Sequence, residues 1–446
     1  MLRKAKILFF SISENIHIFA RRNLSTLMPL SYTDIEIMAP AGNFESLMAA
    51  AQGGANAVYF GVGNLNMRAR AAHNFTINDL PEVVKICKEY NIRSYLTVNI
   101  ICYDSELDAV YQLIDAAKQH GVSAVIASDM AVIKYARQQG VEVHISTQVN
   151  ITNIEAVRFY AAFADTIVLA RELNLSQVSY IARKIIEEQI KGPNGKLVQL
   201  EMFCHGALCM AVSGKCYLSL HEYNASANRG ACYQLCRRGY TATDNESGRQ
   251  LAIDNEYIMS PKDLCTIGFL DKIIAAGARV LKIEGRARSA EYVKTVSSCY
   301  SRAVQAIFEH QYTPELIAAL TEELSRVFNR GFWDGYYQGA RLGEWSEVYG
   351  NKSTQRKTYI AKATNYFGDI GVAEFLVETG EINIGDQLLI IGPTTGVLEI
   401  KAPEIRVDLK PVSKAVKGDY FSMLVPVKIR RADKLYKIES VSADGC

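Results

Sequence analysis

The chain has 446 residues, with 49% hydrophobic and 22% charged side chains and a formal net charge of +2. This composition is typical of a soluble, core-forming protein of two or three domains, and any basic surface for nucleic acid must be local. Ten cysteines are too few for a secreted disulfide scaffold, and their clustering indicates metal binding in a reducing compartment. Apolar runs such as Ile7–Phe10 are too short to cross a bilayer. We therefore expect a cytoplasmic protein without a membrane partner.

The first part of the chain, residues 1–34, is expected to lie outside the folded core. Its basic residues (Arg3, Lys4, Lys6, Arg21 and Arg22) are interrupted by Glu14, which does not fit a secretory signal. A transit-like leader and an upstream start, with Met28 as the true beginning, both remain open.

From Ile35 a unit recurs that consists of a short apolar strand, a polar loop and an amphipathic helix. Near-continuous apolar strands that alternate with helices indicate a parallel sheet buried on both faces. Eight units in some 270 residues favour an α/β fold of the (β/α)8 type, a TIM-like barrel, over residues 35–310. The predicted strands are Ile35–Met38, Ala57–Phe60, Ser94–Val98, Ala124–Ala127, Val141–Ile145, Thr166–Leu169, Val198–Phe203 and Val280–Ile283.

The active site of such a barrel lies at the C-terminal ends of the strands. Polar residues follow the apolar strands at these ends, and three of them, Asn99, Gln148 and Arg171, are candidates for substrate binding. A cysteine-rich insertion, residues 204–265, leaves the end of the seventh strand. It should therefore cap the same face of the barrel.

Four cysteines of this insertion form the most informative cluster of the chain: Cys209, Cys216, Cys232 and Cys236. They are separated by six, fifteen and three residues, and only the last spacing is that of a zinc finger or ribbon. Thiolates gathered from one irregular segment suit zinc or an iron–sulfur cluster. The spacing leaves both metals open, and buried structural thiols are the third alternative. Cys265 is a further thiol of unassigned role.

Two polar groups near the strand ends are candidates for catalysis. Glu201 and His205 alternate along the seventh strand, so we expect both on one face, as acid and base or as substrate ligands. Lys282 and Glu284 follow in the eighth strand and are assigned to the same catalytic group. After them, Arg286 and Arg288 are candidates for gripping a carboxylate or phosphate.

Beyond the barrel, residues 311–356 are predicted to form a helical linker with an aromatic, glycine-rich end that packs on the barrel or stacks on bases. Residues 357–446 alternate polar and apolar side chains between turns, which predicts a small antiparallel β-barrel. Between Lys401 and Lys437 this domain has ten basic residues against four acidic ones. Such a surface is compatible with RNA-backbone contact, and a solvated charged face is the alternative.

The pattern E-x-F-x-H-G-A-L-C-M-A-x-S-G-x-C-Y-L-S, from Glu201 to Ser219, resembles the defining motif of the collagenase-like peptidase family formerly of unknown catalytic type. The segments MAPAGNFESLMAA, GANAVYFG, LARELNLSQV and LKIEGRARS resemble its other blocks, and the resemblance covers about residues 35–350. Length and the added C-terminal domain are most similar to the branch that forms 5-hydroxyuridine at the wobble position of tRNA.

This resemblance implies an RNA hydroxylase that works without molecular oxygen and is linked to prephenate as a co-substrate. It also implies a [4Fe–4S] cluster on Cys209, Cys216, Cys232 and Cys236, tRNA as the macromolecular partner, and an electron-transfer partner protein. Hydroxylation of a ribosomal RNA cytidine, a metal-dependent peptidase with His205 and Glu201 in its site, and a zinc-stabilised RNA-binding protein are the alternatives.

Overall fold

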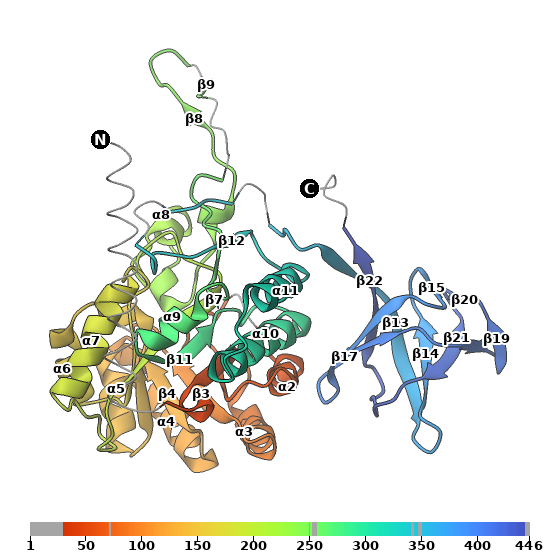
Figure 1. The fold of residues 1–446 in the computed structure, drawn as a ribbon, viewed down its shortest axis with the longest axis horizontal. Helices are drawn as coiled ribbons and strands as arrows, with labels where there is room; N and C mark the ends of the chain where they lie inside the picture. The colour runs from red at the N-terminus through yellow and green to blue at the C-terminus, as the bar shows by residue number, and fades with distance from the viewer. Residues whose placement is uncertain are drawn as a thin grey trace.

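Eight parallel strands close into a barrel in the computed structural model, which describes residues 30–70, 73–248, 250–251, 257–339, 343–346 and 350–441. The last barrel strand pairs with both the first and the seventh, which closes the ring. The strands are β1 (Glu36–Pro40), β2 (Ala57–Gly61), β3 (Arg93–Val98), β4 (Ala124–Ala127), β5 (Glu142–Ile145), β6 (Thr166–Val168), β7 (Gln199–Gly206) and β11 (Ala278–Ile283). The predicted (β/α)8 architecture is confirmed (Figure 1).

Helices cover the outside of the barrel, and the polar residues before them explain where several begin. Asn43 accepts a hydrogen bond from the backbone N–H of Ser46 (2.8 Å), and Asn153 and Asn174 cap two later helices in the same way. The helices are α2 (Phe44–Gln52), α3 (Leu80–Glu89), α4 (Leu107–His120), α5 (Met130–Gln138), α6 (Ile154–Ala161), α7 (Leu175–Glu187), α9 (Leu270–Ala275) and α10 (Ala290–Phe308).

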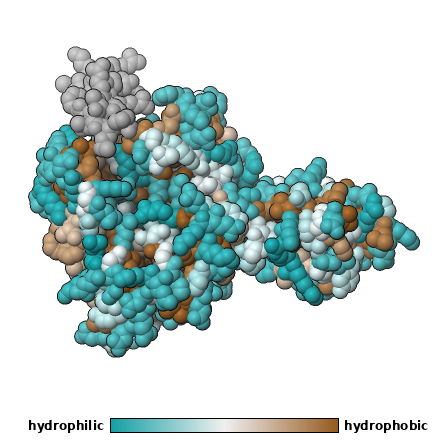
Figure 2. Space-filling view, turned by 90° about the horizontal axis from the view of Figure 1, so that it is seen from below, coloured by the Kyte–Doolittle hydropathy of each residue, from teal (hydrophilic) through white to brown (hydrophobic). Residues whose placement is uncertain are grey.

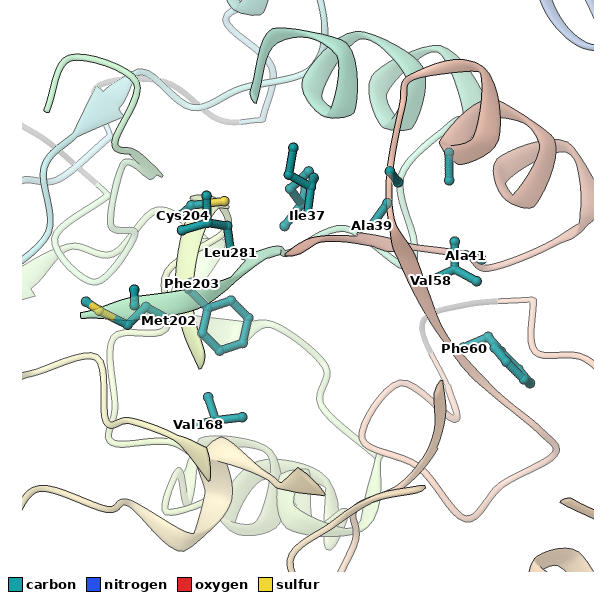
Figure 3. Close-up of a cluster of buried hydrophobic side chains, with 14 of the residues drawn as sticks. Ile37, Ala39, Ala41, Val58, Phe60, Val168, Met202, Phe203, Cys204 and Leu281 are labelled. Carbon is teal, nitrogen blue, oxygen red and sulfur yellow. The ribbon is translucent and has the colours of Figure 1, made fainter. Parts of the chain in front are cut away.

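The main hydrophobic core lies between the strands and these helices. Figure 3 shows Ile37 and Leu281, from β1 and β11, among the buried side chains of this layer. A second, smaller cluster that includes Met38, Tyr59 and Tyr95 fills the inside of the barrel. Both faces of each strand are therefore buried, which is why the strands appear in the sequence as unbroken apolar runs.

The insertion after β7 leaves the barrel at the end where the strands finish. It contains α8 (Leu218–Tyr223) and the hairpin of β8 (Ala242–Thr243) and β9 (Gln250–Leu251), which projects away from the barrel (Figure 1). It returns through β10 (Asp263–Cys265), which pairs antiparallel with the end of β7.

The segment after α10 packs on the barrel through aromatic side chains. It forms α11 (Pro314–Ser325) and β12 (Phe332–Trp333), which pairs with β10. Tyr337 is buried; its hydroxyl donates to the carbonyl of Phe203 (2.9 Å) and its carbonyl accepts from the N–H of Leu175 (2.9 Å). These aromatic residues therefore cover the end of β7.

The C-terminal region is antiparallel, as predicted, and has its own hydrophobic core. One eight-stranded sheet has the order β17-β16-β22-β13-β14-β21-β18-β19, and β15 and β20 form a two-stranded sheet. Among the described residues, β17 and β19 at the ends of the large sheet are not paired with each other. The strands are β13 (Gln355–Phe367), β14 (Val372–Val377), β15 (Glu381–Asn383), β16 (Gln387–Gly392), β17 (Gly396–Lys401), β18 (Ile405–Val407), β19 (Lys410–Val412), β20 (Lys414–Val416), β21 (Tyr420–Leu424) and β22 (Lys434–Ser440).

The two regions are joined by direct contacts as well as by the chain. The side chain of Gln52 on α2 bonds to the carbonyl of Thr395 (2.9 Å) and the N–H of Val397 (2.8 Å). Lys294 on α10 donates to the carbonyl of Val397 (3.1 Å). Figure 2 shows hydrophobic side chains exposed among hydrophilic ones on this smaller domain.

Residues 1–29 of the predicted N-terminal extension lie outside the described residues, and Tyr32–Asp34 form a short 3-10 turn before β1. Within the described part of the chain no helix is both long enough and apolar enough to span a membrane.

Candidate functional site: a cysteine-lined cavity

A cavity of about 160 Å³ lies at the C-terminal end of the barrel, and all four cysteines of the predicted cluster line it. Its other walls come from the loop after β2, from the end of β11 and from the segment before β12. An apolar cavity of about 150 Å³ takes up a molecule of the size of benzene. The cavity therefore has room for a compact group of several heavy atoms.

Two glycines let the cysteine segment pass close to other backbone. Gly206 ends β7 with φ +102°, and a Cβ there would lie 2.4 Å from the carbonyl oxygen of Glu284. Gly230 has φ +82°, and its Cβ would lie 2.4 Å from the carbonyl oxygen of Asn66. Only glycine combines a positive φ with so little space for a side chain. The two glycines therefore let the segment lie against the end of β11 and the loop after β2.

Irregular chain and one short helical turn carry the thiols. Cys209 follows β7 and Cys216 precedes α8. Cys232 follows the 3-10 turn Ala227–Arg229, and Cys236 lies in the 3-10 turn Leu235–Arg237. The four ligand candidates therefore come from one local stretch of chain.

The chemistry of these thiols fits a bound metal centre. Each of the four is free, and burial raises the pKa of Cys236 to about 11. A protonated thiol loses its proton when it binds metal. No three His, Cys, Asp or Glu side chains in the described residues lie close enough to hold a single metal ion.

Arginine side chains surround the thiols. Arg68, Arg237, Arg288 and Arg330 line the cavity. Arg237 is fixed by hydrogen bonds to the carbonyls of Leu208 (2.7 Å) and Pro261 (2.6 Å). These guanidinium groups offset the negative charge that four thiolates bring.

Asp263 on β10 holds two of these arginines in place. Arg330 lies 3.3 Å and Arg288 3.7 Å from its carboxylate oxygens. The guanidinium of Arg288 also stacks on the ring of Phe328 (3.6 Å to the ring centre). Arg288, predicted to bind substrate, thus lies at the cavity with part of its charge already neutralised.

Glu284 is the carboxylate of the cavity wall. It accepts hydrogen bonds from the Nη2 (2.5 Å) and Nε (3.2 Å) of Arg68, and Tyr59 Oη lies 3.3 Å from it. Burial alone would raise its pKa, but the charges of Arg68, Arg171 and Arg286 outweigh this and lower the pKa of Glu284 to about 2. Glu284 is therefore ionised at neutral pH, and it cannot act as a general acid there.

Two further predicted residues, Lys282 of β11 and Arg286 after it, lie below the cavity with Glu201. Lys282 donates to Glu201 Oε1 (2.6 Å), and both side chains are almost fully buried. Arg286 donates to the hydroxyl of Thr97 (2.9 Å), and burial lowers its pKa to about 10. A Cβ at Gly61 would lie 2.4 Å from Arg286 Nη1. This packing keeps Arg286 out of the cavity wall.

The three strand-end residues predicted to bind substrate lie between the barrel and the cavity. Asn99 accepts from the N–H of Met67 (3.1 Å) and donates to Gln148 Oε1 (3.4 Å). These two amides therefore support the loop that carries Arg68. Arg171 stacks on the ring of Phe203 (3.9 Å), and its buried Nε has no hydrogen-bond partner.

The prediction that Glu201 and His205 share one face is wrong. The pairing of β7 with β11 shifts between Phe203 and His205, so Cys204 is the extra residue of a β-bulge. Figure 3 shows Phe203 and Cys204 on opposite sides of β7. His205 contacts Tyr292 and Tyr300 of α10, with ring centres 6.0 and 5.6 Å away. It thus faces the helices, and Glu201 faces the barrel interior.

His205 should make the fold acid-sensitive. Burial lowers its pKa to about 3 in the folded chain, against an ordinary value of about 6.5. Below pH 6.5 the unfolded chain binds a proton that the folded chain does not. The stability present above this pH is therefore lost as the pH falls, by at most about 1.4 kcal/mol per pH unit. We expect His205→Gln to flatten this dependence between about pH 6.5 and 5, measured by urea unfolding. An equal slope in both proteins would contradict the prediction.

Several residues of the site escaped the sequence reasoning. Arg68 lies in the long loop after β2, and Arg237, Asp263 and Arg330 lie in irregular segments or short strands. The one signal in the sequence was the place of Arg68 in the loop after a barrel strand, because such loops form the active-site end of the fold.

Comparisons with known proteins identify a family and several relatives. The model of peptidase family U32 matches residues 42–347. A collagenase of Porphyromonas gingivalis is 56% identical over 410 residues, which cover 92% of this chain and 99% of that protein. A tRNA hydroxylation protein of Bacillus subtilis is 32% identical over 80% of this chain and 83% of its own length. A 23S rRNA 5-hydroxycytidine synthase of Escherichia coli is 34% identical over 71% of this chain and 47% of its own length.

Proposed function

The chain belongs to peptidase family U32, as its motifs indicated, and we propose that it hydroxylates a pyrimidine base of RNA at the cysteine-lined cavity. The observation that carries this proposal is the convergence of Cys209, Cys216, Cys232 and Cys236 on one cavity rich in arginine. The names of the Bacillus and Escherichia relatives point to the same type of reaction. The specific target that we propose is the wobble uridine of tRNA.

The four cysteines would hold a [4Fe–4S] cluster. Such a cluster supplies one-electron chemistry when bound, and a partner protein would exchange electrons with it. Arg68 and Arg237 would balance the charge of the thiolates. Gly206 and Gly230 would keep the ligand segment close to the barrel.

The remaining cavity residues would bind the reactants. Arg288 and Arg330 present guanidinium groups that suit a carboxylate or a phosphate, and prephenate is the co-substrate that we propose for them. Replacement of a C–H bond of the base by C–OH is a two-electron oxidation, so prephenate would supply the oxygen atom and accept the two electrons. Glu284, ionised and fixed by Arg68, would orient a hydrogen-bond donor of the base. Asn99 and Gln148 would act through the loop that they support rather than through the substrate.

A peptidase is the second candidate, because the Porphyromonas relative is named a collagenase. Hydrolysis of a peptide needs an activated nucleophile or a metal-bound water. Glu201 and His205 are the residues predicted for this reaction, but Glu201 faces the inside of the barrel and His205 faces the helices outside it. The geometry therefore supports the hydroxylase better.

The test is to purify the protein without oxygen and to measure iron, sulfide and zinc. The protein is then incubated with tRNA, prephenate and a chemical reductant, and nucleosides from the digested RNA are analysed by mass spectrometry. We expect about four irons per chain and a uridine heavier by one oxygen atom. Denatured collagen serves as the parallel substrate. A zinc-containing protein that cleaves collagen and leaves RNA unchanged would overturn the proposal.

A further inference from the structure

The mouth of the cysteine-lined cavity exposes an unusual number of large apolar side chains. Met210 and Val212 line the cavity and are 46% and 45% exposed. Tyr217, next to Cys216, is 73% exposed, and Tyr223 on α8 is 43% exposed. Scattered apolar residues are normal on a protein surface, but a group around one opening marks an interaction site.

Flat side chains are stacked at the same place. The rings of Tyr223 and Tyr233 stack with centres 4.7 Å apart, and Arg70 lies 4.1 Å above Tyr233. Arg238 donates to the hydroxyl of Tyr223 (3.0 Å). In a separate contact, Arg229 lies 3.8 Å above the ring of Tyr103, which is in the loop after β3. The guanidinium groups hold the rings in fixed orientations.

The charge of this surface favours a polyanion. Residues 207–240 contain one acidic side chain, Glu222, against four basic ones, Lys215, Arg229, Arg237 and Arg238. Arg229 is paired with Glu106 (2.6 Å) and Arg237 lies in the cavity wall, so the cations left for a ligand are Lys215 and Arg238, with Arg70 beside them. Exposed aromatic rings beside arginine and lysine are the features that bind unpaired nucleotides, since bases stack on the rings while phosphates contact the cations. An apolar protein partner would gain nothing from the excess of positive charge.

We propose that this rim, formed by Met210, Val212, Tyr217, Tyr223 and Tyr233, binds a single-stranded loop of RNA, with Tyr217 as the platform for a base next to the one that enters the cavity. This inference rests on the proposed function and adds the form of the substrate. A base inside a duplex is paired and stacked, so it reaches an enclosed cavity only after extrusion from the helix. A loop presents bases that are already unpaired.

The experiment measures RNA binding by fluorescence anisotropy at one fixed salt concentration. The probes are a labelled RNA hairpin with a uridine-rich loop and a fully paired RNA duplex of the same length. The variants are Tyr217→Ala, Tyr217→Phe and, as a matched control, Tyr180→Ala. Tyr180 is 47% exposed on α7, within the barrel's helical layer. Because Tyr217 is exposed, we expect its variants to keep the fold, which their thermal midpoints will check.

We expect Tyr217→Ala to raise the Kd for the hairpin at least about fivefold, the loss of one base–aromatic stack. Tyr217→Phe keeps the ring and should bind as the wild type does, as should Tyr180→Ala. Duplex binding should be unchanged in all three. Equal hairpin affinity in Tyr217→Ala and the wild type would overturn the inference, and so would an equal loss on hairpin and duplex.

Binding and hydroxylation are scored separately, so the two proposals can fail independently. Hairpin binding that depends on Tyr217, in a protein that leaves RNA unmodified, would support the docking surface and refute the hydroxylase. Hydroxylated RNA together with unaltered hairpin binding by Tyr217→Ala would refute the docking surface alone.

Discussion

Replacement of Cys209 by alanine is expected to abolish both the iron–sulfur cluster and RNA hydroxylation. Cys209 is exposed on the cavity wall, so its loss removes one of four thiolates without leaving a hole in the core. A cluster held by three ligands has an iron open to solvent and oxygen. Iron and sulfide per chain, the visible absorption spectrum and the yield of modified nucleoside should therefore fall together.

Cys102→Ala is the matched control for this experiment. Cys102 is also partly exposed and free, but it lies in the loop after β3 and does not line the cavity. Its variant should keep full iron content and activity. If Cys209→Ala retained iron, sulfide and modification at the level of Cys102→Ala, the assignment of the cluster ligands would be refuted.

A large loss of stability is expected when the buried ion pair of Glu201 and Lys282 is broken. Glu201→Leu leaves the ammonium of Lys282 inside the barrel without its 2.6 Å partner. An uncompensated buried charge of this type costs about 3–5 kcal/mol of the free energy of unfolding. Replacement of both residues, Glu201→Leu with Lys282→Met, removes the charge as well and should recover most of the loss. Chemical denaturation of the three proteins measures the difference.

The exposed pair of Glu381 and Lys414 provides the comparison. Its atoms are 3.1 Å apart, but the side chains are 47% and 54% exposed, so Glu381→Leu should cost far less of the free energy of unfolding than Glu201→Leu. The prediction would be wrong if Glu201→Leu were no more destabilising than Glu381→Leu. It would also be wrong if the double variant Glu201→Leu, Lys282→Met were as unstable as Glu201→Leu alone.

The barrel could be predicted because its strands are buried on both faces. Segments such as Ala57–Gly61 and Ala124–Ala127 are fully buried, and continuous apolar runs of this kind stand out in a sequence. The short strands β10 and β12 could not be found in the same way. They have three and two residues, which is too few for any periodicity, and their pairing depends on contacts between distant parts of the chain.

The candidate site was only partly visible in the sequence for a related reason. The cysteines are close together along the chain, so their common cavity could be anticipated. Arg68 meets Glu284 across 216 positions of sequence, and no local pattern records such a contact. The bulge at Cys204 had the largest effect on the prediction, because one extra residue turned His205 to the other face of its strand.

The order of the site residues along the chain has a consequence for how the protein is made. All four thiols leave the ribosome before β11 (Ala278–Ile283), the strand that closes the barrel, and before Arg288 and Arg330, which complete the cavity wall. The ligands of the proposed cluster are thus available to a metal donor while the growing chain is still open. Closure by β11 then brings Glu284 and Arg288 to the cavity wall. Loading of the proposed cluster could therefore precede ring closure, since its ligands are made before the last barrel strand.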